Sequence, residues 1–442
     1  MTKNLTEGNP AKLIVLFTIP LLIGNIFQQF YNMTDMVIVG RTLGVNALAA
    51  VGCTGSIIFL VLGFTVGLTS GLSIVTAQRF GSHDEAGVRK SLTIGILITL
   101  AVTLVLTTVS VLMARPILEL MRTPPEIIED AHDFVVIIFA GMAASMMFNL
   151  LSNTIRALGD SKTPLFFLMF TCALNIILDF TFILVFRSGV AGAALATIIS
   201  QFIAGSLCIV YIKKRLPILH LSRADWNISG WEVLQCAKMA FPMAFQMSII
   251  AIGAVVLQFA LNQLGEISVA AFSTAQKIDA IAMLPMNSFG VTMATYTAQN
   301  YGAGKIDRIK KGVLQCSIIS VSFSIVVGLV NILAGYQLAS LFVGSNAPEV
   351  SGLVQTYLII NGSQYFLLAM LFIFRFTLQG LGKGVMPTVA GIMELLMRMF
   401  AALILSSYFG FAGACWSGPL AWLGACIPLA IAFFTVMRQF ST

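Results

Sequence analysis

Long apolar stretches alternate with short polar segments along the whole chain of 442 residues. Twelve stretches are predominantly apolar over about 20 residues or more, the length that an α-helix needs to cross the hydrocarbon core of a bilayer. We place them at residues 13–38, 47–74, 91–113, 134–156, 164–186, 189–212, 238–263, 268–298, 313–337, 351–378, 386–408 and 411–436. The pattern therefore predicts an all-α integral membrane protein with twelve transmembrane helices.

The two halves of the chain repeat each other at a shift of 221 positions. Residues 76–81 read TAQRFG and residues 297–302 read TAQNYG, and the same shift carries the Leu-Gly pair at 43–44 onto that at 264–265. These matches indicate a tandem duplication with six helices per repeat. Because six is even, both repeats share one orientation, and we expect two lobes related by a pseudo-two-fold axis along the membrane normal.

The duplication predicts a domain boundary in the polar segment that follows the sixth span. We assign residues 1–212 to an N-lobe, 213–231 to a cytoplasmic linker and 232–442 to a C-lobe. Each repeat begins with a proline inside its first helix, Pro20 and Pro242. Proline removes a backbone hydrogen bond and permits a kink, so these residues are interpreted either as static kinks or as bending points for gating.

The distribution of basic residues orients the predicted helices. The net charge of +7 would suggest nucleic-acid binding in a soluble protein, but 58% of this chain is apolar and only 10% is charged. With a cytoplasmic N-terminus, eighteen lysines and arginines fall on the inner side and four on the outer side. This positive-inside bias predicts cytoplasmic N- and C-termini, a basic face near anionic lipid, and no nucleic-acid partner.

Ionisable side chains inside the predicted spans are candidate functional residues, because charge is costly in hydrocarbon. Gln28, Tyr31 and Asp35 are spaced by three and four positions, which places them on one face of the first helix. A single polar face in an apolar helix indicates a cavity. The alternative is that Asp35 lies near the outer end of the helix and pairs with Arg41 at the interface.

The fifth and sixth spans carry further polar candidates. Asn175 and Asp179 share one face of the fifth span, and Thr197 follows a run of small residues in the sixth. Together with Asp35, they would provide two carboxylates, an amide and a hydroxyl. Oxygen ligands suit a hard cation such as Na⁺, and two close carboxyls suit a proton, because both do not ionise readily together. A structural hydrogen bond between helices is a third interpretation of Asn175 and Asp179.

The second half also has ionisable residues within its spans. Glu394 and Arg398 are four positions apart with the acid first, which is the favourable order for an ion pair, so a structural role competes with a gating role. We place Arg375, and Lys277 with Asp279, on the cytoplasmic side. Seven cysteines without paired metal spacing and three histidines in predicted loops indicate no cofactor and no metal centre.

Several motifs resemble those of the MATE (multidrug and toxic compound extrusion) family. They are YNMTD at 31–35 with Gly40, the repeated Ala-Gln-x-x-Gly, RALGD at 156–160 with Pro164, and LNxxLD at 174–179. The likeness covers nearly the whole chain. It implies two six-helix lobes around a V-shaped cavity and cation-coupled export of organic compounds. It also implies that the N-lobe holds a cation site, formed by Asp35, Asn175, Asp179 and Thr197.

The resemblance further implies a substrate cavity that includes Gln28 and Tyr31, to which we add Asn153 and Gln246. Family members that resemble NorM carry an acid in the tenth helix at the position where this chain has Ala369. This departure disfavours a NorM-like sodium site in the C-lobe and favours the DinF-like bacterial branch. We therefore expect the acidic coupling site in the first half only.

The sequence thus predicts a multi-pass antiporter of the bacterial inner membrane that exports amphipathic or cationic compounds, including antibiotics, against H⁺ or Na⁺. We expect a monomer whose partners are small organic substrates and the lipid bilayer. A lipid-linked precursor flippase is the alternative, which fourteen spans or a strongly cationic cavity would favour. An enzyme is disfavoured because no nucleophile–base or metal constellation lies in the spans, and a channel because no filter-like ring does.

Overall fold

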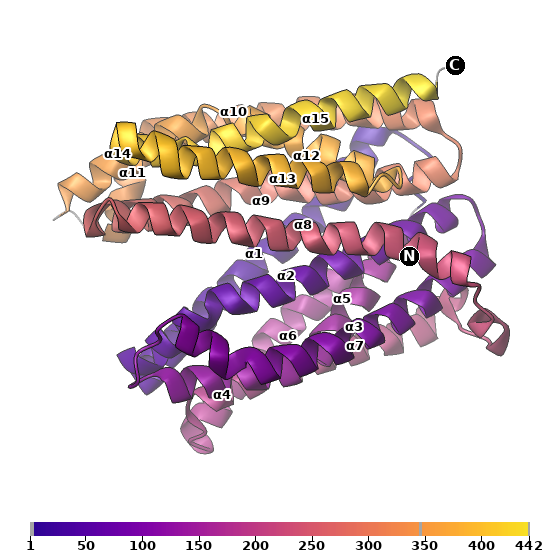
Figure 1. The fold of residues 1–442 in the computed structure, drawn as a ribbon. Helices are drawn as coiled ribbons and strands as arrows, with labels where there is room; N and C mark the ends of the chain where they lie inside the picture. The colour runs from indigo at the N-terminus through magenta and orange to yellow at the C-terminus, as the bar shows by residue number, and fades with distance from the viewer. Residues whose placement is uncertain (1–3, 344–346, 441–442) are drawn as a thin grey trace. The chain divides into compact units, whose positions relative to one another are not determined.

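The computed structural model describes residues 4–343 and 347–440, which form helices joined by short turns, without a β-strand (Figure 1). The first half contains α1 (Pro10–Leu43), α2 (Val45–Gly81), α3 (Glu85–Leu120), α4 (Ile128–Ala140), α5 (Met142–Ala157), α6 (Lys162–Phe180), η1 (Thr181–Val185) and α7 (Gly189–Arg215). The segment that follows contains η2 (Pro217–Leu219) and η3 (Arg223–Trp226). The second half contains α8 (Gly230–Asn262), α9 (Glu266–Gly302), α10 (Ile306–Val343), α11 (Pro348–Gly362), α12 (Tyr365–Gly380), α13 (Val385–Phe400), η4 (Ala401–Leu405), α14 (Ser406–Cys415) and α15 (Ser417–Gln439).

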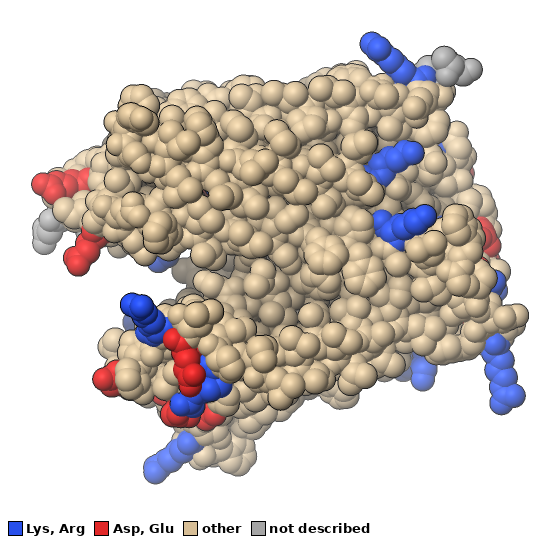
Figure 2. Space-filling view, viewed as in Figure 1, with Lys and Arg blue, Asp and Glu red and all other residues tan. Residues whose placement is uncertain are grey.

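The helices confirm the predicted membrane-spanning architecture. Within the described residues, ten helical spans are long and apolar enough to cross a membrane, and up to twelve when each bent pair counts as one span. The bent pairs are α4 with α5 (46°) and α11 with α12 (49°), the fourth and tenth predicted spans. On the face shown in Figure 2, Lys, Arg, Asp and Glu gather toward the ends of the helices, and uncharged residues cover the region between them.

The repeat is visible in the backbone at two pairs of glycines. Gly44 and Gly265 both have φ of 91°, and each precedes the second helix of its repeat. Gly189 and Gly410 have φ of 58° and 56°, each where the chain turns into the last span of its repeat. Residues with a Cβ adopt this left-handed region with strain, so both repeats need glycine at these turns.

The chain divides into two compact units whose membership crosses the repeats. Unit 1 holds residues 23–244, and unit 2 holds residues 5–22 together with residues 245–440. The start of α1 therefore groups with the second repeat, and the start of α8 with the first, unlike the predicted lobes. Membership changes two residues after Pro20 in α1 and two residues after Pro242 in α8.

The start of α8 packs closely against α2 within unit 1. A Cβ on Gly71 would lie 2.6 Å from the Cα of Ala240, so only glycine allows this approach. The start of α1 is held differently within unit 2. There Thr18 Oγ1 and Thr292 Oγ1 share a hydrogen bond of 2.7 Å. Because Thr292 is the repeat equivalent of Gly71, the two crossing segments are fixed at equivalent places, by close packing in one unit and a hydrogen bond in the other.

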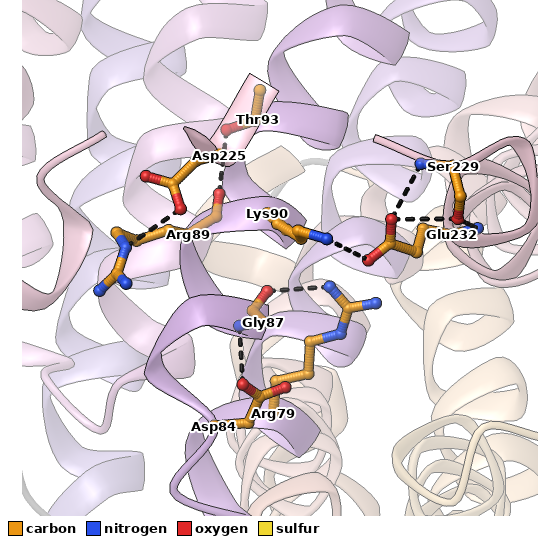
Figure 3. Close-up of polar contacts among 9 residues, drawn as sticks. All are labelled: Arg79, Asp84, Gly87, Arg89, Lys90, Thr93, Asp225, Ser229 and Glu232. Atoms are coloured by element: carbon orange, nitrogen blue, oxygen red, sulfur yellow. Dashed lines mark hydrogen bonds and ion pairs between the residues drawn. The ribbon is translucent and has the colours of Figure 1, made fainter. Parts of the chain in front are cut away.

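The linker before α8 is tied to the N-terminal turn of α3 (Figure 3). Arg89 Nε lies 3.2 Å from Asp225 Oδ1, and Lys90 Nζ lies 3.2 Å from Glu232 Oε1. Asp84 caps α3 by accepting a hydrogen bond from the Gly87 N–H at 2.8 Å. These contacts all lie within unit 1, where they fix the entry of the linker into α8.

The segment before α1 is fixed at the equivalent turn of unit 2, but through backbone groups. Gln299 Oε1 accepts from the Leu5 N–H at 2.9 Å, and Asn300 Nδ2 donates to the Leu5 carbonyl at 3.2 Å. Arg308 Nη1 donates to the Gly8 carbonyl at 2.9 Å. The two docking segments are therefore equivalent in position and different in chemistry: side-chain ion pairs in unit 1 and bonds to the backbone in unit 2.

Candidate cation site

One face of α1 presents the first group of predicted site residues to the interior of unit 1. Gln28, Tyr31 and Asp35 are partly buried, whereas Phe30 and Met33 on other faces are 61% and 60% exposed. The spacing of three and four residues places the polar side chains together. The helix thus turns its polar face away from its most exposed apolar side chains.

Helices α6 and α7 provide the partners of this face. Asp179 and Asn175 are fully buried. In the amide orientation that satisfies both of its groups, Asn175 donates to Asp179 Oδ2 at 3.0 Å and accepts from the Thr197 N–H at 3.3 Å. The Tyr31 hydroxyl donates to Thr197 Oγ1 at 3.1 Å. These bonds join α1, α6 and α7 at one point of unit 1.

The carboxyl groups of Asp35 and Asp179 lie close enough to interact electrostatically. Two carboxylates only accept hydrogen bonds, so a hydrogen bond between them would need a proton on one of them. Neither forms an ion pair with a lysine or arginine in the part of the chain that the structure describes. The site therefore carries acidic groups without fixed countercharge.

Two oxygens of this pair have unused bonding capacity. Oδ1 of Asp35 and Oδ1 of Asp179 are both buried and have no hydrogen-bond partner among the described residues. A buried polar atom without a partner is unfavourable unless something else satisfies it. A proton or a small cation would do so. Na⁺ would have oxygen donors from the two carboxyls, the Asn175 amide and the hydroxyl of Thr197.

A small cavity in unit 1 shares Tyr31 with the group of bonds that joins α1, α6 and α7. It is lined by Gln28 and Tyr31 of α1, Thr171 of α6, and Ser200 and Gln201 of α7, among others. Ser200 Oγ is buried without a partner among the described residues. The wall of the cavity thus contains polar groups, and two of the four residues assigned to the substrate cavity line it.

The other two assigned cavity residues lie elsewhere. Asn153 of α5 donates to Thr69 Oγ1 of α2 at 3.3 Å and accepts from Arg156 Nη1 at 3.3 Å. Gln246 belongs to unit 2, where its Oε1 accepts from Gln379 Nε2 at 3.0 Å. Neither is among the residues that line the small cavity of unit 1.

A π-helical turn, η1, begins two residues after Asp179 at the end of α6. The second repeat has its own π-helical turn, η4, in the equivalent place after α13. Such turns are rare and occur often at functional sites. Since both repeats have the turn and only the first has the acid at this position, the turn belongs to the shared architecture.

The charged residues of unit 2 form a triad rather than the predicted pair. Glu394 Oε2 accepts from Arg375 Nη2 at 2.6 Å, and Glu394 Oε1 accepts from Arg398 Nη2 at 3.2 Å. Arg375, which we placed on the cytoplasmic side, has a side chain that is 5% exposed and joins α12 to α13. The acid-first pair of Glu394 and Arg398 forms as the spacing suggested.

Asp279 of α9 is a second buried carboxylate of unit 2. It accepts hydrogen bonds from the hydroxyls of Tyr357 (2.9 Å) and Tyr365, and Tyr365 accepts from Asn331 Nδ2 at 3.0 Å. Lys277, grouped with it in the prediction, is exposed on another face. Buried acids are therefore not confined to the first half. The sequence feature that indicates a buried acid here is the position of Asp279, thirteen residues after the start of the long helix α9.

Comparison with known proteins adds a family and several relatives. The family model MatE matches residues 20–181 and 242–404, one segment in each repeat. "Probable multidrug resistance protein YpnP" of Bacillus subtilis (strain 168) is 32% identical over 306 residues, covering 69% of this chain and 68% of the relative. "Probable multidrug resistance protein YoeA" of the same organism is 27% identical over 420 residues, covering 92% and 89%.

A solved structure shares the fold over almost the full length. It is an outward-facing multidrug resistance MATE family transporter of the MOP superfamily, with a TM-score of 0.90 and 23% identity, covering 99% of this chain and 97% of that one. At this identity the likeness shows the fold. The match in both repeats agrees with the duplication seen in the chain.

Proposed function

Since this chain belongs to the MatE family, we propose that it is an antiporter that exports amphipathic or cationic organic compounds in exchange for H⁺ or Na⁺. The names of the relatives support the export of drugs, because YpnP and YoeA are both named probable multidrug resistance proteins. The absence of an acid at Ala369 supports the DinF-like branch, with coupling through unit 1.

The observation that carries the proposal is the acidic pair of Asp35 and Asp179. Asp179 is fully buried and Asp35 is partly buried, neither has a basic partner among the described residues, and each keeps one buried oxygen without a hydrogen bond. A structural pair of helices would be stabilised better by a neutral hydrogen bond, since isolated charge is unfavourable inside a membrane. Acids held in this way are suited to take up and release a cation during each cycle.

Coupling follows if the cation binds one conformation of unit 1 more tightly than another. A ligand shifts a conformational equilibrium only through its difference in affinity for the two states. Asp35 lies on α1 and Asp179 on α6, so a proton or Na⁺ shared between them would stabilise the arrangement in which these helices meet. Loss of the cation would leave two carboxyls that repel each other and favour their separation.

The two prolines are suited to be the bending points in this cycle. Pro20 and Pro242 each lack a backbone N–H inside a spanning helix, and each lies two residues before the chain changes from one unit to the other. Bending at these prolines would let a unit change its conformation while α1 and α8 remain helical. The chain would act as a monomer in a bacterial inner membrane, with both termini in the cytoplasm.

The flippase alternative is less well supported. It would call for fourteen spans or a strongly cationic central cavity, and the described residues give at most twelve spans.

The proposal is tested with purified protein in proteoliposomes loaded with a cationic dye such as ethidium. Dye movement is followed under a Na⁺ gradient alone and then under a pH gradient alone. We expect one of the two gradients to drive movement in the wild type, and Asp35→Asn to abolish that movement while leaving expression intact. Asp133→Asn is the matched control, because its side chain is 65% exposed at the start of α4.

Two outcomes would overturn the proposal. One is movement by Asp35→Asn at the wild-type rate. The other is wild-type protein that responds to neither gradient with cationic, zwitterionic or neutral amphipathic dyes.

A further inference from the structure

Three charged side chains meet inside unit 2, and their charges do not cancel. Glu394 accepts from both Arg375 and Arg398, so one carboxylate faces two guanidinium groups. The side chains of the three are 9%, 5% and 17% exposed. One positive charge is therefore left over within the predicted membrane span, where charge needs a partner.

The triad also has hydrogen-bonding groups that are not used. Nε of Arg375 is buried and has no partner among the described residues, and the same is true of Oε1 of Gln379. Arg375 is 4% and Gln379 is 2% exposed, and they are one turn apart on α12. Gln379 Nε2 reaches Gln246 Oε1 on α8. Arg375 thus keeps an unused buried donor beside the excess charge, whereas the unused atom of Gln379 is an acceptor and would not bind an anion.

Arg398 is the accessible member of the triad. In the described parts of the chain it donates one hydrogen bond, from Nη2 to Glu394, which leaves other N–H groups of its guanidinium free. Its side chain lies across α8 at Gly253, where a Cβ would come within 3.2 Å of Arg398 Cδ. The glycine leaves room for the arginine, whose side chain is partly exposed.

The other buried acid of unit 2 does not balance the charge. Both oxygens of Asp279 already accept hydrogen bonds from Tyr357 and Tyr365. Tyr365 precedes Arg375 by ten positions on α12, which corresponds to about 15 Å along a helix. Asp279 is therefore engaged at another level of the unit.

We propose that Arg398 and Arg375 form a subsite for the single anionic group of an amphipathic molecule. A carboxylate or phosphate would accept from the guanidinium groups in the planar geometry that arginine favours and would neutralise the excess charge. This inference rests on the proposed function and extends its substrate class to compounds that carry an anion. The same chemistry also fits the phosphate of an anionic lipid.

The test uses two dyes that differ only at the anionic group, rhodamine B with a free carboxylate and its ethyl ester. Binding to the full-length protein in phosphatidylcholine nanodiscs is followed by fluorescence polarisation. Arg398→Gln should weaken binding of the acid about tenfold, the usual effect of losing a charged hydrogen bond, and leave the ester unchanged. Arg398→Lys should bind the acid with an affinity between those of the wild type and Arg398→Gln, because lysine keeps the charge and lacks the planar donor pair.

The ratio of the two affinities is the decisive quantity, since a variant that merely loosens the fold would weaken both dyes. Equal loss of both dyes, or no loss of the acid, in folded Arg398→Gln would overturn the inference. Phosphatidylglycerol nanodiscs separate the sources of the anion: competition with the acid in the wild type, and not in Arg398→Gln, would show a lipid headgroup in the same subsite. The binding assay uses no ion gradient, so a failed efflux assay and a failed subsite are distinguishable.

Discussion

The two units differ in whether the charged side chains in their interiors have partners of opposite charge. In unit 1, Asp35 and Asp179 lie together without a basic partner among the described residues, and each keeps an oxygen without a hydrogen bond. In unit 2, Glu394 is bonded to Arg375 and Arg398. The repeat positions do not correspond: Asp35 is equivalent to Val256, and Asp179 to Phe400. The two repeats therefore share their architecture but carry their buried charged residues at different positions.

This difference separates charges that hold the fold from charges left available for a ligand. A buried ion pair stabilises neighbouring helices only while both partners are present. Two acids without a basic partner contribute little to stability, because burial in the membrane removes the water that would solvate their charge. Removing a charged group from unit 2 should therefore mainly lower stability, whereas removing one from unit 1 should mainly impair transport.

The largest effect on stability is expected from Glu394→Gln. The change leaves Arg375 and Arg398 without a counter-ion in a buried environment, which destabilises a protein by about 3–5 kcal/mol. Asp179→Asn replaces a carboxyl that has no ion pair by a group of the same shape and should change stability by less than about 1 kcal/mol. Thermal unfolding in one detergent, measured for both variants and the wild type, gives the comparison.

The contrast fails if the two variants lose similar stability. It also fails if Asp179→Asn is the less stable of the two. Either result would mean that the acids of unit 1 act as structural groups in the same way as the triad of unit 2.

A smaller effect is expected at the surface, where the linker meets α3 (Figure 3). Hydrogen bonds from Ser222, followed by that from Arg89, hold the pKa of Asp225 below its ordinary value. A lowered pKa stabilises the docked linker above the ordinary value of about 4, and the stabilisation is lost as the pH falls through the lower, folded value. Asp225→Asn should cost under about 1 kcal/mol, because Arg89 is partly solvated.

Hydrogen exchange of residues 222–227 provides the measurement. In the wild type, exchange should quicken between pH 5 and pH 3 beyond its intrinsic pH dependence, and in Asp225→Asn this extra change should be absent. The segment before α1 is the internal control, because Gln299 and Asn300 hold it through groups that do not titrate. An equal pH response in both segments would contradict the assignment to Asp225.

Much of the fold follows from local features of the sequence. Apolar length alone locates the twelve spans, and the repeated glycines at 44 and 265 mark the same turn. The face that carries Tyr31 and Asp35 follows from helical spacing, and Tyr31 on that face donates to Thr197 of α7.

Contacts between distant parts of the chain could not be predicted from local features of the sequence. Asp279 meets tyrosines that lie 78 and 86 positions away, and Arg375 meets Glu394 on the following span. Periodicity describes one helix at a time and contains no information on which neighbour it packs against. For the same reason, the sequence did not show that the starts of α1 and α8 group with the other repeat.

The assignment of coupling to unit 1 is decided by comparing Asp179→Asn with Asp279→Asn in gradient-driven dye transport. Both variants remove a buried carboxylate, one from each unit, so they are matched in chemistry. We expect Asp179→Asn to lose transport driven by the coupling gradient and Asp279→Asn to retain most of it, because the tyrosines already satisfy Asp279. Transport that persists in Asp179→Asn and disappears in Asp279→Asn would contradict this assignment.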